Sequence, residues 1–411
     1  MEINQTALNE AFKPEKGAKV KKEDKLKNPA ESKLWIVFLV VGIVCLLGGI
    51  GTLIGALMVK PAEVEAIDFP AVPSVAEDNP IFSNLTGEPL ADAALVNAPA
   101  FCMQVPNGMD GARPQAGLDQ AGVIFEAIAE AGITRFAAIF QNPTAAVIGP
   151  IRSLRMYYLE WDTPFDCIIT HAGGAPDALV AVRNHKNHDE NLSTMFRGTA
   201  SARRWNNLFT TSAMLSSFAS KYPESKIDGF NRMTPTESNT ARVANLTTTD
   251  FDITKAASGN TSAINVEVPS IKIRFGGIAS YNVNYTYDVD SNKYLRSYAN
   301  GDAHMIYHCP DGDLGSVNPE SACELVQLAP SVVIAMVVQQ RKASDNYHED
   351  ITTTGFGDAY IFQNGTAILG TWKKPTAKDQ IRFIDADGQE IELAPGQTFI
   401  SAIPAYGGVE Y

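Results

Sequence analysis

The chain lacks an excess of basic residues. Its 33 lysines and arginines are outnumbered by 46 aspartates and glutamates, so the net charge at pH 7 is −13. A protein that binds along a nucleic acid needs a basic surface to neutralise phosphates. The composition therefore predicts no nucleic-acid partner, although it allows a local basic pocket.

Several signatures of catalysis and metal binding are missing as well. The sequence holds no G-x-S-x-G elbow, no Walker loop, no H-E-x-x-H and no S-x-x-K set with its partners. Histidine is scarce, and His185 and His188 lie in a hydrophilic, turn-like stretch without further ligands nearby. Asp311 and Asp313 resemble the start of a calcium loop, but the later ligand positions are not filled. We predict no metal site and no cofactor.

Cysteine is also scarce, with five residues in the chain. Four of them lie beyond residue 60, and an even number permits disulfides in an exported segment. Cys309 and Cys323 bracket a turn-rich stretch, and a bridge there would contribute about 3 kcal/mol by the loop-entropy estimate. Cys102 and Cys167 lie in apolar, strand-like runs, where two free buried thiols are nearly as plausible as a bridge.

What the sequence does contain is one uninterrupted apolar run, from Leu34 to Val59, with eight lysines before it and Lys60 directly behind. Its length exceeds the roughly 20 residues that a helix needs to cross a bilayer. A cleaved signal peptide would have a shorter apolar core, and a lipoprotein signal would have small residues before Cys45. We therefore predict a retained single-pass membrane anchor, with a cytoplasmic N-terminus and extracytoplasmic remainder.

The composition changes along the chain and suggests six segments. They are a Lys-rich cytoplasmic tail (1–33), a transmembrane helix (34–59), a Pro-rich stalk (60–99), an α/β domain (100–240), a linker (241–262) and a β-rich domain (263–411). The predicted fold class is thus an α/β N-terminal ectodomain plus a mainly antiparallel β C-terminal domain, α+β overall.

Hydrophobic spacing predicts the elements within these domains. Strands are expected at 101–105, 135–140 and 165–170, and helices at 153–160, 176–182 and 210–220. The segment 119–131 also has helical spacing, with Gly132 as its stop. In the second domain, Asn364-Gly365 and Asp387-Gly388 between apolar runs indicate hairpins.

Arginines and a histidine cluster in one presumptive strand-helix unit. Gly149 and Pro150 precede Arg152 and Arg155, and a proline at the first position of a helix would place both arginines at a helix N-terminus that favours an anion. Pairing of both arginines with acidic neighbours is the simpler alternative. His171 follows a buried strand, next to Gly173 and Gly174, where open α/β sheets bind ligands.

Two carboxylates extend this set. On the predicted helix 119–131, Glu126 and Glu130 lie four residues apart, and Glu126 would lie outside the apolar stripe, open to solvent, a ligand or an arginine. With Arg113 and Arg135 nearby in sequence, a carboxylate could serve as a general base, or it could fix the domain through an ion network.

The segments RPQAGLDQAGVIFEAIAEAGITRFAAIF, IGPIRSLRMYYLEWDTPFDCIITHAGGAPDAL, NKYLRS and GFGDAYIFQNGTAILGTWKKP resemble the YerB-like (DUF3048) family of bacterial extracytoplasmic lipoproteins. The resemblance implies a two-domain extracytoplasmic protein and no known reaction. The polar positions that it carries over are Arg113, Glu126, Arg135, Arg152, Ser153, Arg155, His171, Gly173 and Gly174. The sequence departs from the family in its anchor, at Ala175 after HAGG, and at 234–236, where a histidine-containing run is common.

Two functions of different classes remain. The first is a membrane-anchored protein of the bacterial cell envelope that binds an anionic glycan, peptide or phosphate-bearing ligand at Arg152, Arg155 and His171, or that acts as a scaffold for an envelope protein partner. The second is an envelope hydrolase or transferase, with Glu126 or His171 as general acid/base and the arginines stabilising negative charge. The lack of a nucleophile set favours the first.

Overall fold

The computed structural model describes residues 80–184, 189–191, 206–247, 268, 270–310, 319 and 323–411. Within these ranges, no helix has the length and apolar character that crossing a membrane requires. The predicted tail, the transmembrane helix over 34–59, the stalk up to residue 79, and His185 and His188 all lie outside the described residues. They stay predictions.

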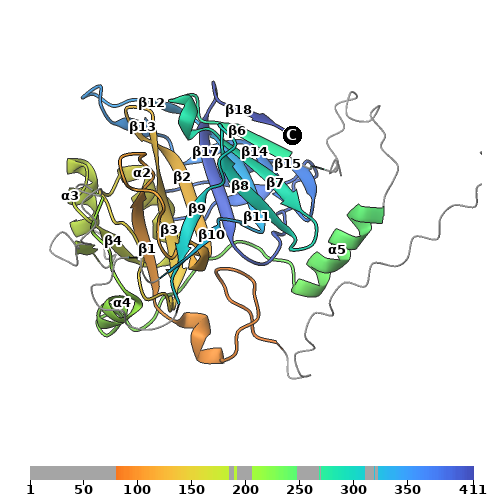
Figure 1. The fold of residues 1–411 in the computed structure, drawn as a ribbon, viewed down its shortest axis with the longest axis horizontal. Helices are drawn as coiled ribbons and strands as arrows, with labels where there is room; N and C mark the ends of the chain where they lie inside the picture. Colours follow the sequence, from red (N-terminus) through yellow and green to blue (C-terminus); the bar gives the residue numbers. More distant parts are fainter. Residues whose placement is uncertain are drawn as a thin grey trace, which may run out of the picture. The chain divides into compact units, whose positions relative to one another are not determined.

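A ten-stranded mixed sheet forms the centre of the fold (Figure 1). Its order is β16-β15-β14-β11-β17-β2-β3-β1-β4-β5. The strands are β1 (Ala100–Pro106), β2 (Val123–Glu130), β3 (Ile133–Gln141), β4 (Ile168–His171), β5 (Asp189–Asn191), β11 (Val332–Val338), β14 (Gly355–Gln363), β15 (Thr366–Lys374), β16 (Arg382–Ile384) and β17 (Thr398–Pro404).

Shorter elements surround this sheet. A four-stranded antiparallel sheet contains β18 (Gly408–Glu410), β6 (Ser270–Arg274), β7 (Val283–Asp288) and β8 (Lys293–Tyr298), and two hairpin-like pairs are β9 (Met305–His308) with β10 (Glu324–Gln327) and β12 (Gln340–Lys342) with β13 (Glu349–Ile351). The helices are α2 (Met156–Asp162), α3 (Pro176–Asn184), α4 (Ser212–Ala219) and α5 (Pro235–Thr247), with 3-10 turns at Ala93–Asn97, Leu118–Gln120, Thr163–Phe165 and Ala279–Tyr281.

Strands β2 and β17 join the two predicted domains into one sheet. They pair in parallel, from Val123 with Thr398 to Glu126 with Ser401. Every residue of both strands is buried. Alternate side chains of β2 enter different cores, because successive residues of a strand point to opposite faces: Ile124 packs on the face covered by the four-stranded sheet, and Phe125 packs against α2.

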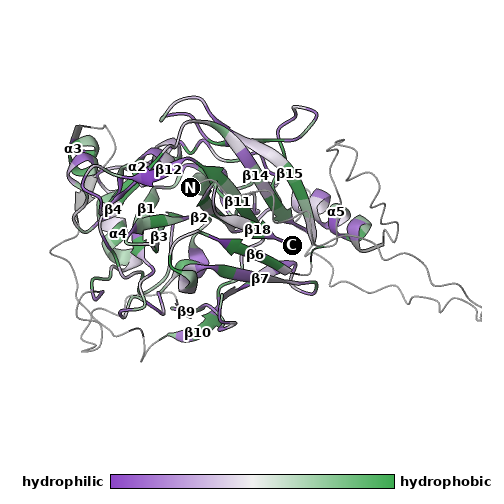
Figure 2. Cartoon of the chain, turned by 90° about the horizontal axis from the view of Figure 1, so that it is seen from above, coloured by the Kyte–Doolittle hydropathy of each residue, from purple (hydrophilic) through white to green (hydrophobic). Residues whose placement is uncertain are grey.

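Burial follows this layering. Hydrophobic residues run along the central strands, for example β11 (Figure 2), whose residues are buried except for a partly exposed Val337. On the α2 side, Trp161 stacks against Phe125 with ring centroids 5.4 Å apart. On the opposite side, Tyr285 of β7 packs edge-on against Phe399 of β17. The sheet is therefore enclosed on both faces by well-packed aromatic side chains.

The helix predicted over 119–131 is wrong. This stretch forms the 3-10 turn Leu118–Gln120 and strand β2, and Ala131 and Gly132, both with positive φ, make the turn into β3. A strand that is buried on both faces is apolar at nearly every position, and such a run also satisfies helical spacing. Gly132 marks a hairpin turn and not a helix end.

Most other elements agree with the sequence. The predicted strands at 101–105, 135–140 and 165–170 correspond to β1, β3 and β4, and the helices expected at 176–182 and 210–220 correspond to α3 and α4. Asn364 and Gly365, with φ of 51° and 76°, form the hairpin between β14 and β15 as predicted. The fold as a whole has few helices and is mostly β, so the first half contains more strand than an α/β domain would.

The segment predicted as a linker begins as a helix. Helix α5 covers residues 235–247, and Thr234 and Glu237 form a capping box before it: Glu237 N donates to Thr234 Oγ1, and Thr234 N donates to Glu237 Oε2 at 2.8 Å. Pro235 stands at the first helical position. These local signals outweigh the polar, Thr- and Asn-rich composition that suggested a linker.

Both cysteine pairs form disulfides. Cys309 and Cys323 are bridged as predicted. Cys102 and Cys167 are bridged too, with their Cα atoms 5.7 Å apart, which decides between the bridge and the free thiols left open by the sequence. The second bridge links β1 to the residue just before β4, which pairs with β1 in parallel.

Candidate functional site

The two glycine- and arginine-containing segments lie side by side. Residues 151–155 run extended along 171–175: Ala172 N donates to Arg152 O at 2.9 Å, and Leu154 N donates to Gly173 O at 3.0 Å. The Gly149–Pro150 peptide is cis, and α2 begins only at Met156. The prediction that Pro150 opens a helix bearing both arginines at its N-terminus is therefore wrong. The backbone of this segment pairs with the HAGG segment instead.

Arg155 and Arg135 share one carboxylate, Glu130. Arg155 Nη2 lies 2.8 Å from Glu130 Oε2, and Arg135 Nη2 contacts Glu130 Oε1. Arg155 Nη1 also donates to the carbonyls of Leu154 and Ser153. All three charged side chains are nearly buried. Their charges are compensated within the protein, in line with the alternative that acidic neighbours pair with these arginines.

The Ser153 side chain links the two segments, whereas Arg152 bonds to Asn206 outside them and His171 bonds within its own turn. Arg152 Nε donates to Asn206 Oδ1 at 2.7 Å, and Ser153 Oγ donates to Ala172 O at 3.2 Å. His171 is fully buried, and its Nδ1 lies 2.6 Å from Gly173 O, a contact in which Nδ1 is the donor. Gly173 has φ of 71°, which favours glycine at this turn. The bond from His171 to Gly173 O stabilises this turn.

Glu126 is completely buried, contrary to the expectation that it lies open to solvent. Thr134 Oγ1 donates to its Oε1 at 2.7 Å, and Asn107 Nδ2 at 3.2 Å. Its Oε2 pairs with Arg296 Nη2 at 2.7 Å. Since both oxygens have internal partners and no exposed surface, Glu126 has no route to a substrate in this structure.

Arg113 lies at the rim of the same buried network. Its Nε donates to Asn107 Oδ1 at 2.9 Å, and its guanidinium lies 3.8 Å from the centre of the Tyr298 ring. Burial lowers the pKa of Arg113, while the nearby Tyr298 acts to raise it. The arginine thus bonds to an amide and stacks on an aromatic ring, and no carboxylate in the described part of the chain bonds to it directly.

Sequence reasoning missed two members of this network, Arg296 and His304. Arg296 is part of the NKYLRS segment, and it contacts Glu126, Tyr285 and His304 from strand β8. His304 Nε2 lies 3.0 Å from Gln115 Oε1. A lone arginine in an alternating strand carries no local signal of its carboxylate partner, because that partner lies in β2, far away in the sequence.

A cleft with charged walls lies beside Arg155. It has a volume of about 780 Å³ and is bordered by the start of α2, the start of α3 and the β12–β13 pair. His348 at the end of this pair bridges to Glu130 at the end of β2. Of the three residues predicted to form a pocket, Arg155 lines this cleft; Arg152 and His171 do not.

The charges of the cleft are mixed, with more carboxylates than cations. Arg341 pairs with Asp350 at 2.7 Å, Lys342 pairs with Glu349, and Arg155 pairs with Glu130 behind the wall. His348 contacts Asp345. Two further carboxylates, Glu160 and Asp177, accept hydrogen bonds from the Thr353 hydroxyl and the backbone N–H of Ala178.

Glu160 and Asp177 are therefore the carboxylates of this cleft without a cation bonded to them among the described residues. Within the same residues, no cluster of histidine, cysteine, aspartate or glutamate is arranged to hold a metal.

The shared sheet, the two disulfides and the paired GPIRSLR and HAGG segments describe a disulfide-bonded, mostly β protein. Residues 85–225 match "Protein of unknown function (DUF3048) N-terminal domain", and residues 271–400 match the corresponding C-terminal domain. The chain belongs to the DUF3048 family.

Two comparisons agree with this membership. "Putative lipoprotein YerB" of Bacillus subtilis (strain 168) is 25% identical over 304 residues, which cover 73% of this chain and 80% of that protein. The crystal structure of YerB from Bacillus subtilis aligns with a TM-score of 0.61 and 21% identity, over 80% of this chain and all of the other. The similarity to the crystal structure supports the fold.

Proposed function

We propose that this chain is an extracytoplasmic protein of the bacterial cell envelope that is held at the membrane by residues 34–59 and binds a ligand in the cleft beside Arg155. The apolar run and the lysines before it support the anchor. The name of the relative YerB, a lipoprotein, supports a place at the membrane. A scaffolding role toward another envelope protein would use the same location.

The ligand that the cleft favours carries a positively charged group, such as the amine of a peptide or an amino sugar. The observation that supports this is that the cationic side chains of this wall already contact carboxylates, whereas no cation of the described residues forms an ion pair with Glu160 or Asp177. An ammonium group could pair with Asp177 without displacing an internal contact. An anion at Arg155 would have to compete with Glu130.

The anionic ligand expected from the arginines is the second candidate for this site, through the exposed Arg341 and Lys342. The side chain of Arg341 is 81% exposed and that of Lys342 is 51% exposed. In their pairs with Asp350 and Glu349, the cation is therefore accessible to solvent. Exposed pairs are weak and can be exchanged for a ligand. The buried positions of Glu126 and His171 favour binding over the hydrolase alternative.

Titration of the full-length protein with a short peptide that has free amino groups tests the proposal. We expect binding by calorimetry, and loss of binding when the same peptide is N-acetylated. Asp177→Asn should weaken binding roughly fivefold to tenfold, because it removes one charge at a few ångströms. Asp358→Asn, an exposed aspartate outside the cleft, is the matched control and should bind like the unchanged protein.

The opposite pattern of peptide binding would contradict the proposal that the ligand carries an amine. If the acetylated, acidic form of the peptide binds and the amine form does not, the cleft takes the anionic ligand. If neither peptide binds, or if Asp358→Asn weakens binding as much as Asp177→Asn does, the cleft is not the site.

A further inference from the structure

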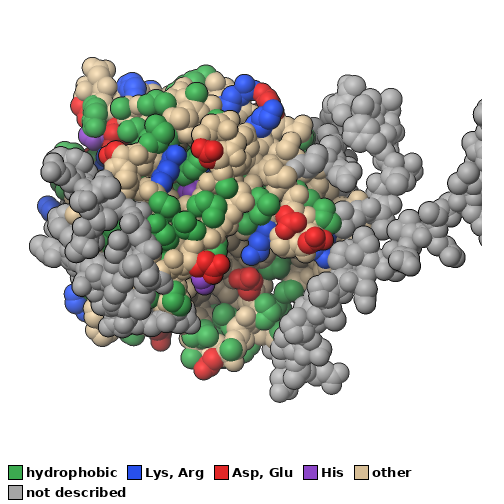
Figure 3. All heavy atoms as spheres, viewed as in Figure 1, with side chains coloured by type: hydrophobic (Ala, Val, Ile, Leu, Met, Phe, Trp, Pro, Cys, Tyr) green, Lys and Arg blue, Asp and Glu red, His purple; other side chains and the backbone are tan. Residues whose placement is uncertain are grey.

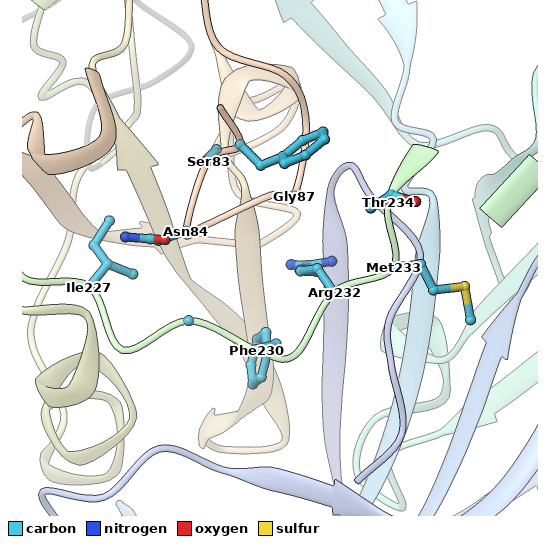
Figure 4. Close-up of a pocket in the computed structure, with 10 residues that line it drawn as sticks. Ser83, Asn84, Gly87, Ile227, Phe230, Arg232, Met233 and Thr234 are labelled. Atoms are coloured by element: carbon cyan, nitrogen blue, oxygen red, sulfur yellow. The ribbon is translucent and has the colours of Figure 1, made fainter. Parts of the chain in front are cut away.

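A second pocket lies at the start of the described chain, away from the cleft. It has a volume of about 320 Å³ and is lined by two segments, the loop 82–87 and residues 227–234 (Figure 4). In Figure 4, Ser83, Asn84 and Gly87 come from the loop, and Arg232 and Phe230 lie on the segment opposite. None of its lining residues also lines the cleft.

Arg232 is the cation of this pocket, and its hydrogen-bond partners among the described residues are all neutral oxygens. Its Nη1 donates to Ala394 O at 2.9 Å and to Thr398 Oγ1 at 2.8 Å, and its Nη2 donates to Leu85 O at 2.8 Å. The Nε–H group is buried and has no hydrogen-bond partner. A guanidinium has five N–H donors, so these hydrogen bonds do not use all of them.

No carboxylate bonds to Arg232 among the residues that the structure describes. The acidic side chain that acts on it is Glu88, which is exposed and affects it only through space. Burial lowers the pKa of Arg232 to about 10, and Glu88 opposes this shift. A largely buried arginine is normally paired with a carboxylate or phosphate, as Arg155 and Arg296 are in this protein. Arg232 has no such partner among the described residues.

The walls of the pocket are fixed before any ligand arrives. Gly229 passes so close to the loop that a Cβ atom there would lie 1.8 Å from Asn84 O. Met233 N donates to Leu393 O, and Leu393 N donates to Asn231 O, so the segment is also tied to the chain leading into β17. Because Arg232 and the backbone around it are held in place, a ligand would meet a preformed cation.

We propose that this pocket binds an oxyanion, the phosphate or carboxylate group of a small molecule or of a chain end, with Arg232 as its counter-charge. The volume suits a group of this size and leaves room for part of what carries it. Asn84, an exposed residue of the lining, adds an amide that can donate to an anion. The site would be separate from the cleft and would take a ligand of the opposite charge.

Inorganic phosphate and acetate, titrated into the full-length protein up to about 10 mM, test the proposal by calorimetry, since even weak sites bind in this range. We expect one site for at least one of the two ions. The ion that binds shows whether the pocket prefers a phosphate or a carboxylate group. Absence of binding by both would overturn the proposal.

Charge changes at the mouth test the location without removing Arg232, whose replacement would also break its bonds to three segments. Asn84→Asp adds a negative charge and should weaken binding about tenfold. Asn84→Ser keeps the site neutral and should change it less than threefold, and Glu88→Gln removes the opposing charge and should strengthen binding. If all three variants bind alike, the anion lies elsewhere.

These outcomes are independent of the amine peptide experiment, because that experiment changes Asp177 at the other cavity. The Asn84 and Glu88 variants separate the two sites, because an anion bound in the cleft at Arg341 and Lys342 would not respond to them.

Discussion

Arg296 and Glu126 form an ion pair with no solvent exposure, in which Nη2 of the arginine lies 2.7 Å from Oε2 of the carboxylate. The two residues are 170 positions apart in the chain. Glu126 belongs to β2 in the central sheet and Arg296 to β8 in the sheet that covers it. The pair therefore connects the two halves of the protein through their common core.

Loss of one partner of this pair should destabilise the fold strongly. Glu126→Gln keeps the size of the side chain but leaves the Arg296 charge buried beside Tyr285 and His304. We expect the free energy of unfolding to fall by about 3 to 5 kcal/mol, measured by urea denaturation.

An exposed pair supplies the control. Asp350→Asn removes the partner of Arg341, whose side chain is 81% exposed, and should cost less than about 1 kcal/mol. Equal costs for the two substitutions would contradict a structural role for the buried pair. If Glu126→Gln were as stable as the unchanged protein, Arg296 would have to find another counter-charge.

Local patterns in the sequence predict the short elements well but not how the halves combine. The hairpin at Asn364 and Gly365 depends on two residues that tolerate positive φ, and this is visible in the sequence. The pairing of β2 with β17 depends on contacts between segments more than 270 positions apart, such as Val123 and Thr398. No local pattern encodes such a partner, so one shared sheet could not be distinguished from two domains.

The candidate site shows the same division. The sequence raises an ion network of Glu130 with Arg135, and pairing of Arg155 with acidic neighbours, as alternatives to a ligand site, and in the structure these three residues share a buried ion cluster. It does not reveal that Glu126 is buried, because this depends on reading β2 as a strand enclosed on both faces. The cleft was missed for a similar reason: the β12–β13 pair meets Glu130 only in the folded protein, through the bridge to His348.

The disulfides predict the number of free thiols. Cys102 pairs with Cys167 and Cys309 with Cys323, so only Cys45 of the five cysteines remains. Alkylation of the denatured, unreduced protein, read by mass spectrometry, should therefore label one cysteine, whereas the reduced control should label all five. Three labels, including Cys102 and Cys167, would show that the bridge across their 65-residue separation is absent, with a loss of about 4 kcal/mol of expected stabilisation.

His304 predicts a loss of stability in mild acid. Burial lowers its pKa well below the ordinary 6.5, and the charges of Arg296 and Arg113 lower it further. Arg296 can only donate, so Nδ1 of His304 accepts its hydrogen bond and Nε2–H donates to Gln115. The bond that Nδ1 accepts requires the neutral ring, because protonation of Nδ1 would remove its lone pair and place a second cation against Arg296.

The unfolded chain therefore binds a proton at His304 that the folded protein excludes. The stabilisation is complete above pH 6.5 and is lost as the pH falls below it, by up to about 1.4 kcal/mol per pH unit. Urea denaturation between pH 7.5 and 5.5 should show a steeper decline in the unchanged protein than in His304→Gln. An identical decline in both would mean that His304 is not held neutral.

Asp162 predicts the opposite dependence on pH. It is fully buried at the end of α2, and burial raises its pKa well above the ordinary 3.8, although the hydrogen bond from Gln104 Nε2, at 2.9 Å, opposes this. Its Oδ1 and the Oε1 of Gln104 are buried without partners. The folded protein thus binds a proton that the unfolded chain releases above pH 4, and stability falls as the pH rises toward the folded pKa.

Asp162→Asn should remove this cost, because an amide carries no charge to desolvate and brings a donor to a place where acceptors lack partners. We expect the variant to gain stability over the unchanged protein, and to gain more at pH 8 than at pH 5. The comparison at each pH isolates this position, since His304 is present in both proteins. A loss of stability that is larger at pH 8 would show that the Asp162 carboxylate is ionised and has a partner in the folded protein.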